Sequence, residues 1–221
     1  MLVLILVMAL LGATVGFVLD VACNRVPVVG LRYPVVELVT AVLFVALALR
    51  LSGAHLLVAL PAYLYFVAVG VALTLIDLDC KRLPNVLVLP SYPIMLALLG
   101  GASAWQHDGA ALARALIGMG ALLALYLVLA LIHPAGMGFG DVKLAGVLGA
   151  ALGYLSYLAL VIGAFAGFFL GAVLGLALIL SRRGSRKSAI PFGPFMIAGA
   201  LLAVFAAEPL GRGYLRLVTR T

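Results

Sequence analysis

The sequence predicts an all-α membrane protein, a bundle of about eight transmembrane helices, and three observations support this prediction. Of the 221 residues, 67% are hydrophobic and only 10% are charged. A soluble domain is about half apolar and about a quarter charged. The mean hydropathy is +1.33. Uncharged runs of membrane-spanning length follow one another along the whole chain.

About 20 consecutive apolar residues cross a bilayer as a helix, so the uncharged runs and the turn signals between them predict the spans, although the second span carries Glu37. The predicted spans are roughly 1–19, 34–52, 55–76, 84–100, 111–132, 141–154, 156–180 and 190–207. The first begins at Met1 with no basic residue before it, which favours a retained span over a cleaved secretory signal. The run Leu144–Ser181 is too long for one helix, so we expect a tight turn near Gly153–Tyr157. No repeat or linker is visible, and we expect residues 1–221 to form a single integral membrane domain.

Basic residues between the spans predict which side faces the cytoplasm. One side carries nine of them, namely Arg25, Arg32, Lys81, Arg82, Lys143, Arg182, Arg183, Arg186 and Lys187. The other side carries five, namely Arg50, Arg114, Arg212, Arg216 and Arg220. Because Lys and Arg concentrate in cytoplasmic segments, we expect the first side to be cytoplasmic. The polar segment 181–188, SRRGSRKS, then sets the orientation or, alternatively, holds a partner or anionic lipid.

Composition also narrows the classes of function. The net charge of +7 does not indicate a nucleic-acid partner, because the basic residues are scattered between spans and form no aromatic-rich groove. Cys23 and Cys80 are far apart, and neither belongs to a Cys-x-x-Cys pair. The sequence therefore predicts no zinc site, no other metal and no cofactor, with the lipid bilayer as the surroundings.

Two aspartates close segments that are otherwise almost entirely apolar. Asp77 ends the run VGVALTLID, and Asp141 ends the glycine-rich turn GMGFGD. A carboxylate at the edge of a membrane span is costly, so each is a candidate functional group, and both fall at the predicted cytoplasmic face. Asp79 follows two residues after Asp77 and faces elsewhere if the helix continues. We favour Asp77 as the reactive group because we expect it to be the more buried.

The residues before Asp141 allow two interpretations. Gly136, Gly138 and Gly140 let the backbone adopt positive φ and let a second backbone approach closely, as a loop that presents Asp141 to an extended peptide requires. Alternatively, the small residues serve helix packing, and Asp141 is the N-cap of a helix that begins at Val142. Pairing with Asp77 favours the first interpretation.

Two carboxylates that share one site do not both ionise readily, so they titrate as a pair. In aspartic proteolysis the ionised member removes a proton from water, and the protonated member donates to the scissile carbonyl. No nucleophilic serine or cysteine is needed for this chemistry. The three histidines, at positions 55, 107 and 133, fit no Ser/His/Asp or Cys/His arrangement.

Taken together, these motifs resemble the type IV prepilin peptidases, a family of Gly-x-Gly-Asp membrane aspartyl proteases. The resemblance covers nearly the whole chain. It is carried by GFVLDVACNRVP, RYPVVELVTAVLF, LIDLDCKRLPNVLVLP, GMGFGDVKLAGVLGA and IPFGPFMIAGA. It implies that Asp77 and Asp141 are the catalytic aspartates, in a multi-pass protein of the bacterial cytoplasmic membrane. The implied substrates are prepilins or pseudopilins, cut after a glycine between a short basic leader and the hydrophobic helix.

The sequence departs from the family pattern in three places. The larger bifunctional members carry a cytoplasmic insert with paired Cys-x-x-Cys motifs, but here Pro27 is followed within a few residues by Arg32. The resemblance therefore implies a short form without the zinc site, in which N-methylation of the product is in doubt. Asp20 stands where relatives usually have asparagine, and Asn85 stands where many have aspartate after the proline. Asp20 either caps or is solvated at the helix end, which we favour, or helps to bind a basic leader.

The resemblance also suggests supporting residues. Glu37 is expected to pair with Arg32 or a neighbouring helix in a mainly structural role. Lys143 either tunes the acidity of Asp141 or extends to the membrane interface. The segment Pro191–Pro194, with Gly193, either lies near the active site or simply begins the last span.

Two other classes of function remain open. A proton- or cation-coupled transporter also uses intramembrane carboxylates, but it predicts inverted repeats, and none is apparent. A catalytically silent scaffold for pilus assembly would tolerate the loss of either aspartate.

Overall fold

The structure is a computed structural model, and it describes residues 1–23, 34–53, 56–133, 137–180 and 191–218. These residues form helices and short connections and contain no strand, which confirms the predicted all-α class. Some residues discussed above lie outside the described ranges, namely Arg25, Pro27, Arg32, His55, Gly136, the polar segment 181–188 and Arg220.

Eight α-helices and one short 3₁₀ helix make up this part of the chain. They are α1 (Leu2–Cys23), α2 (Val35–Gly53), η1 (Leu57–Ala59), α3 (Leu60–Cys80), α4 (Asn85–Gln106), α5 (Gly109–Ile132), α6 (Phe139–Leu155), α7 (Tyr157–Leu180) and α8 (Gly193–Val218). Seven helical segments in the described ranges are long and apolar enough to cross a membrane. The exception is α6, which has 17 residues. The protein is therefore a multi-pass membrane protein.

The chain divides into two compact units, residues Met1–Gly109 and Ala110–Thr221. Unit 1 holds α1 to α4, and unit 2 holds α5 to α8. Each unit is described by itself below. That the whole chain acts as one domain stays a prediction.

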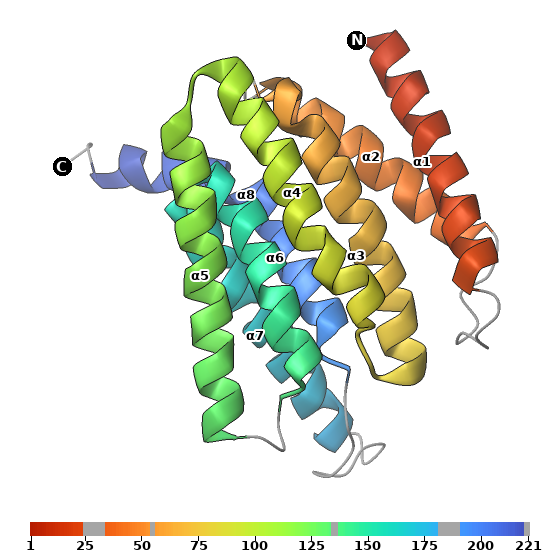
Figure 1. The fold of residues 1–221 in the computed structure, drawn as a ribbon, viewed down its shortest axis with the longest axis vertical. Helices are drawn as coiled ribbons and strands as arrows, with labels where there is room; N and C mark the ends of the chain where they lie inside the picture. The colour runs from red at the N-terminus through yellow and green to blue at the C-terminus, as the bar shows by residue number, and fades with distance from the viewer. Residues whose placement is uncertain (24–33, 54–55, 134–136, 181–190, 219–221) are drawn as a thin grey trace. The chain divides into compact units, whose positions relative to one another are not determined.

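In unit 1, glycines bring the backbones of α1 and α2 into direct contact, and Figure 1 shows α1 alongside α2 and α2 alongside α3. A Cβ atom at Gly12 would lie 2.6 Å from the Cα of Ala41, and one at Gly16 would lie 2.6 Å from the Cα of Glu37. Larger residues would force the helices apart, as in other membrane bundles.

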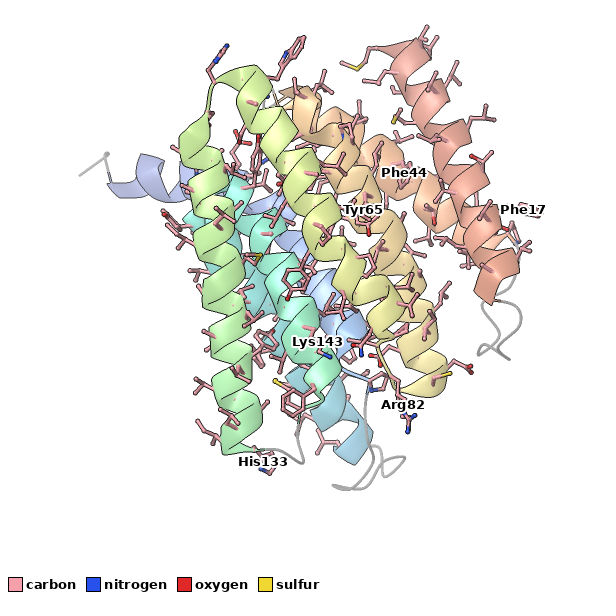
Figure 2. The ribbon with its side chains drawn as sticks, viewed as in Figure 1. Phe17, Phe44, Tyr65, Arg82, His133 and Lys143 are labelled. Carbon is pink, nitrogen blue, oxygen red and sulfur yellow. The ribbon has the colours of Figure 1, made fainter. Side chains whose placement is uncertain are left out.

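Side chains of α1 and α2 differ in how far they are buried. Phe44 of α2 is almost fully buried, whereas Phe17 of α1 is 55% exposed, as suits a lipid-facing position (Figure 2). The hydroxyl groups of Tyr65 on α3 and Ser91 on α4 are hydrogen-bonded at 3.0 Å, which ties these two helices together.

Unit 2 repeats the same principle of close glycine contact. Gly118 of α5 meets Gly149 of α6 backbone to backbone, and Gly199 of α8 meets Gly167 of α7 in the same way. Helices α7 and α8 lie side by side along much of their length (Figure 1). Glycine on both sides of a contact permits such an approach without side-chain clashes.

The predicted spans agree with the observed helices in number but not at every boundary. The predicted turn near Gly153–Tyr157 is confirmed, because α6 ends at Leu155, Ser156 is extended, and α7 begins at Tyr157. The predicted end of the third span at residue 76 is wrong, because α3 continues to Cys80. No Gly or Pro interrupts residues 77–80, so nothing stops the helix until Lys81 adopts a left-handed conformation.

Candidate active site

Asp77 lies in the last turn of α3 and is only 4% exposed. Its backbone carbonyl accepts a hydrogen bond at 2.9 Å from the N–H of Lys81, which caps the helix with φ of 52°. The backbone of Asp77 therefore takes part in the hydrogen bond that closes the last turn of α3. A buried acid at such a point is a candidate functional group.

Asp79 differs from Asp77 in its surroundings. It is partly exposed, and its carboxylate is 3.7 Å from the thiol of the exposed Cys80. The difference in burial on which the preference for Asp77 rested is present in the structure. Which of the two carboxylates reacts stays a prediction.

Asp141 is the third residue of α6 and therefore not its N-cap. The helix begins at Phe139, and the backbone carbonyl of Gly138 accepts the first helical hydrogen bonds, so Gly138 is the N-cap. The alternative in which Asp141 caps a helix beginning at Val142 is therefore wrong. The glycine turn stops two residues earlier because Phe139 and Gly140 already join the helix. The positive φ expected of these glycines is also not observed, since Gly138 is extended with φ of −75° and Gly140 is helical.

From this position the Asp141 carboxylate contacts its own loop. Its Oδ2 atom accepts a hydrogen bond at 3.2 Å from the backbone N–H of Gly138. This is the acid half of a capping box, and the helix dipole favours a negative charge at this point. A Cβ atom at Gly138 would lie 3.3 Å from Oδ2, so glycine leaves the carboxylate room to settle there.

A cluster of aromatic rings lies near Asp141 in unit 2. Tyr126 of α5 stacks on Phe168 of α7 with ring centroids 5.1 Å apart, and Phe192 lies 5.5 Å from Phe168. The Tyr126 ring is within electrostatic reach of the Asp141 carboxylate. Nothing in the sequence around Tyr126 indicates that it lies near Asp141, since it is one aromatic residue in a long apolar run.

Phe192 connects this cluster to the proline segment before α8. Its backbone carbonyl accepts hydrogen bonds from Phe195 and Met196, so it is the N-cap, with Gly193 buried at the first position and Pro194 at the second. Pro191 precedes the cap. The interpretation as a helix entry is confirmed, and a role for Pro191 or Gly193 in the active site stays a prediction.

Lys143 is half-buried in the first part of α6, and it lies at the same end of unit 2 as His133 (Figure 2). Gly140 is the second residue of the helix. Both residues flank Asp141, and their expected supporting roles are not tested by this geometry.

Glu37 is the third residue of α2 and is 7% exposed. Neither of its carboxylate oxygens has a hydrogen-bond partner among the described residues. The expected pairing with Arg32 concerns a residue outside the described ranges. A buried carboxylate of this kind cannot be recognised from sequence, because its lack of a donor depends on how the helices pack.

The structure places Asp77 in unit 1 and Asp141 in unit 2, so their pairing stays a prediction. Within the described ranges, no group of three or more His, Cys, Asp and Glu residues is arranged to hold a metal ion.

The fold and these residues define a class, namely multi-pass helical membrane proteins with an acid in the last turn of one helix and in the first turn of another. The type IV leader peptidase family matches residues 64–180, more than half of the chain, and the match includes Asp77 and Asp141. The chain belongs to this family.

Individual relatives agree with the family. A protein of Aeromonas hydrophila named prepilin leader peptidase/N-methyltransferase is 39% identical over 190 residues, which are 85% of this chain and 62% of that protein. Relatives with the same name are 34% identical in Pseudomonas aeruginosa, with 85% and 63% covered, and 28% identical in Bacillus subtilis, with 86% and 72% covered. The chain thus spans about three fifths of the length of the Aeromonas and Pseudomonas proteins. No solved structure gives a significant match.

Proposed function

We propose that this protein is a membrane aspartyl endopeptidase that removes the short basic leader from prepilins or pseudopilins. The cut falls after a glycine, at the cytoplasmic face of the bacterial cytoplasmic membrane. The observation that carries the proposal is that Asp77 and Asp141, each at an end of an apolar helix, both fall within the part of the chain that matches the leader peptidase family. The names of the relatives support the choice of substrate.

In the proposed reaction the two carboxylates share one proton. The ionised carboxylate accepts a proton from a water molecule, and the water oxygen attacks the carbonyl carbon of the glycine. The protonated carboxyl donates its proton to the carbonyl oxygen, giving a tetrahedral intermediate. As the C–N bond breaks, the carboxyl that took the water proton donates it to the leaving nitrogen. The other carboxylate takes a proton from a hydroxyl of the intermediate, so the pair is again singly protonated.

Several neighbouring residues fit supporting roles in this reaction. The N–H of Gly138 holds one oxygen of Asp141, which orients the carboxylate before substrate arrives. We propose that Gly140 lets the substrate backbone approach, and that Lys143 contributes positive charge near Asp141. Pro191 and Gly193 are proposed to border the same site.

N-methylation is not part of the proposed activity. The relatives carry both activities in their names. The segment between Pro27 and Arg32 leaves no room for the cysteine-rich insert that the larger family members carry there. We therefore propose peptide cleavage alone.

The test is cleavage of a co-expressed prepilin by single-residue variants. Because general acid and base catalysis each contribute about a hundredfold or more, we expect Asp77→Asn and Asp141→Asn each to lower the cleavage rate at least that far. Immunoblots of precursor and mature pilin measure the rate. Mass spectrometry of the product reports the cut position and any added methyl group.

Controls separate chemistry from folding. Asp108→Asn removes an acid just after α4, beyond the candidate site, and is expected to cleave normally. Asp79→Asn is expected to have a smaller effect than Asp77→Asn, and the reverse order would transfer the role to Asp79. Normal cleavage by either Asp77→Asn or Asp141→Asn, at membrane levels equal to wild type, would contradict the proposed pair.

A further inference from the structure

The buried carboxylate of Glu37 has no hydrogen-bond partner in the described part of the protein. It is 7% exposed, and both of its oxygens are covered without meeting a hydrogen-bond donor among the described residues. A buried polar group without a partner is costly, and an ionised one is far more so. Such a residue therefore calls for a positive partner or a bound proton.

The start of α2 explains why the helix does not supply that partner. The N–H of Leu38 donates to the carbonyl of Pro34, so Pro34 is the N-cap and Glu37 stands at the third helical position. A glutamate there usually accepts a hydrogen bond from the N–H of the N-cap residue. Proline has no N–H, so this bond cannot form.

The neighbours of Glu37 do not replace the missing donor. The hydroxyl of Thr40, one turn along, donates to the carbonyl of Val36 at 2.8 Å and is thus engaged in its own helix. Gly16 of α1, which lies against the Glu37 backbone, has no side chain. The helix dipole meanwhile favours the ionised form at the N-terminus of α2.

Glu37 also lies at the same end of unit 1 as Asp77. Val36 and Leu75 belong to one buried cluster, and Asp77 is two residues beyond Leu75. The start of α2 and the end of α3 are at this end of the unit in Figure 1. Asp20 lies one turn beyond Gly16 on α1, on the same helical face, and adds a second acid toward this end.

We propose that Glu37 binds a positively charged side chain of the substrate leader, a lysine or arginine on the amino-terminal side of the cut. This inference rests on the proposed function, in which a basic leader comes to the end of unit 1 that holds Asp77. The attraction between a carboxylate and a cation is stronger in a site of low dielectric than in water. Asp20 adds negative potential along the approach.

The experiment measures binding of leader peptides to the full-length protein in lipid nanodiscs. Two fluorescent peptides span the leader and the cut, one with its lysines intact and one with each lysine replaced by glutamine. Both are titrated against Glu37→Gln and unaltered Glu37, in an Asp141→Asn background that prevents cleavage. The matched control is Asp108→Asn, which removes one acid just after α4 instead.

Loss of one charge-assisted hydrogen bond weakens binding by about tenfold or more. We therefore expect Glu37→Gln to raise the Kd of the lysine peptide by at least that factor and to leave the Kd of the glutamine peptide unchanged. Glu37→Asp, which keeps the charge on a shorter side chain, should give an intermediate Kd. It serves as the test variant if Glu37→Gln does not accumulate.

Equal lysine dependence in Glu37→Gln and in the parent would overturn the inference and identify Glu37 as a carboxyl that holds a proton in place. Thermal unfolding gives a second readout. A group without a partner should cost no stability when it is neutralised, so a lower Tm in Glu37→Gln, with unchanged peptide binding, would show an internal ion pair instead. Failure of the proposed function is distinguishable, because in that case unaltered protein cleaves no prepilin whatever the Kd values are.

Discussion

Helices α2 and α6 begin in nearly the same way, but only the N-cap of α6 has a backbone N–H to donate. Among the helices of the described ranges, only these two carry an acid in the first turn, Glu37 in α2 and Asp141 in α6. In both, the acid is the third residue after the N-cap. The N-cap of α6 is Gly138, whose N–H reaches the carboxylate at 3.2 Å, whereas the N-cap of α2 is Pro34, which has no N–H.

This difference decides whether the N-cap can hold the acid three positions later. In α6 the N–H of Gly138 fixes the direction of the Asp141 carboxylate. In α2 the N-cap is proline and offers Glu37 no such donor, and none is found among the other described residues.

A substitution that makes α6 begin like α2 should lower the rate of prepilin cleavage strongly. Gly138→Pro removes the donated N–H, and the φ of −75° at Gly138 suits proline. A hydrogen bond to a charged group contributes about 1.5–3 kcal/mol, so we expect the rate of prepilin cleavage to fall about 10- to 100-fold. Single-turnover cleavage of purified substrate measures the rate.

Gly138→Ala is the matched control for that variant. It introduces the same Cβ, 3.3 Å from Oδ2, but keeps the N–H. Equal losses in Gly138→Ala and Gly138→Pro would show that space, not the hydrogen bond, is what glycine provides.

A second variant tests how the contact with α1 fixes the first turn of α2. Gly16→Val places side-chain atoms against the backbone of Glu37, where a Cβ alone would lie 2.6 Å from its Cα. Overpacking of this kind costs about 1–3 kcal/mol, so we expect the free energy of unfolding to fall by that amount. Denaturation in mixed micelles measures it. Gly100→Val in α4 is the control, because a Cβ there meets nothing within 4 Å, and an equal loss would contradict the prediction.

The smallest expected effect comes from making α2 begin like α6. Pro34→Ala supplies the missing N–H, and Glu37 can then complete its half of a capping box. The loss of proline also loosens the unfolded chain, so the informative quantity is the coupling between Pro34→Ala and Glu37→Gln. We expect a coupling of about 0.5–1 kcal/mol in the free energy of unfolding, with the gain only where Glu37 is present. Additive effects of the two substitutions would refute it.

Sequence alone predicted the helices well because the bilayer imposes a length and a composition on each span. It was less successful at helix ends. The fourth span was predicted to end near residue 100, yet α4 continues to Gln106, because Gly100 and Gly101 weaken the helix without stopping it. For α3, the end depended on the left-handed conformation of Lys81, a residue type that gives no such signal.

Only part of the candidate site could be predicted from sequence. Because charge is costly in an apolar segment, Asp77 and Asp141 stand out as candidate functional residues from sequence alone. The N–H of Gly138 on Asp141 required the exact start of α6, and the ring cluster of Tyr126, Phe168 and Phe192 required the packing of α5, α7 and α8. Contacts between helices distant in sequence leave no local pattern.

The contact between Gly118 and Gly149 has a consequence for the depth of Asp141 in the bilayer. With 17 residues, α6 is too short for hydrophobic length to determine its position, and residues 144–154 are all buried. Its height is therefore set by the glycine contact with α5, which lies 149 − 141 = 8 residues from Asp141, or about 12 Å along the helix. The number of residues between Asp141 and Gly149 therefore determines both the height and the direction of the carboxylate. One residue added between them would turn the carboxylate by about 100° around the helix axis.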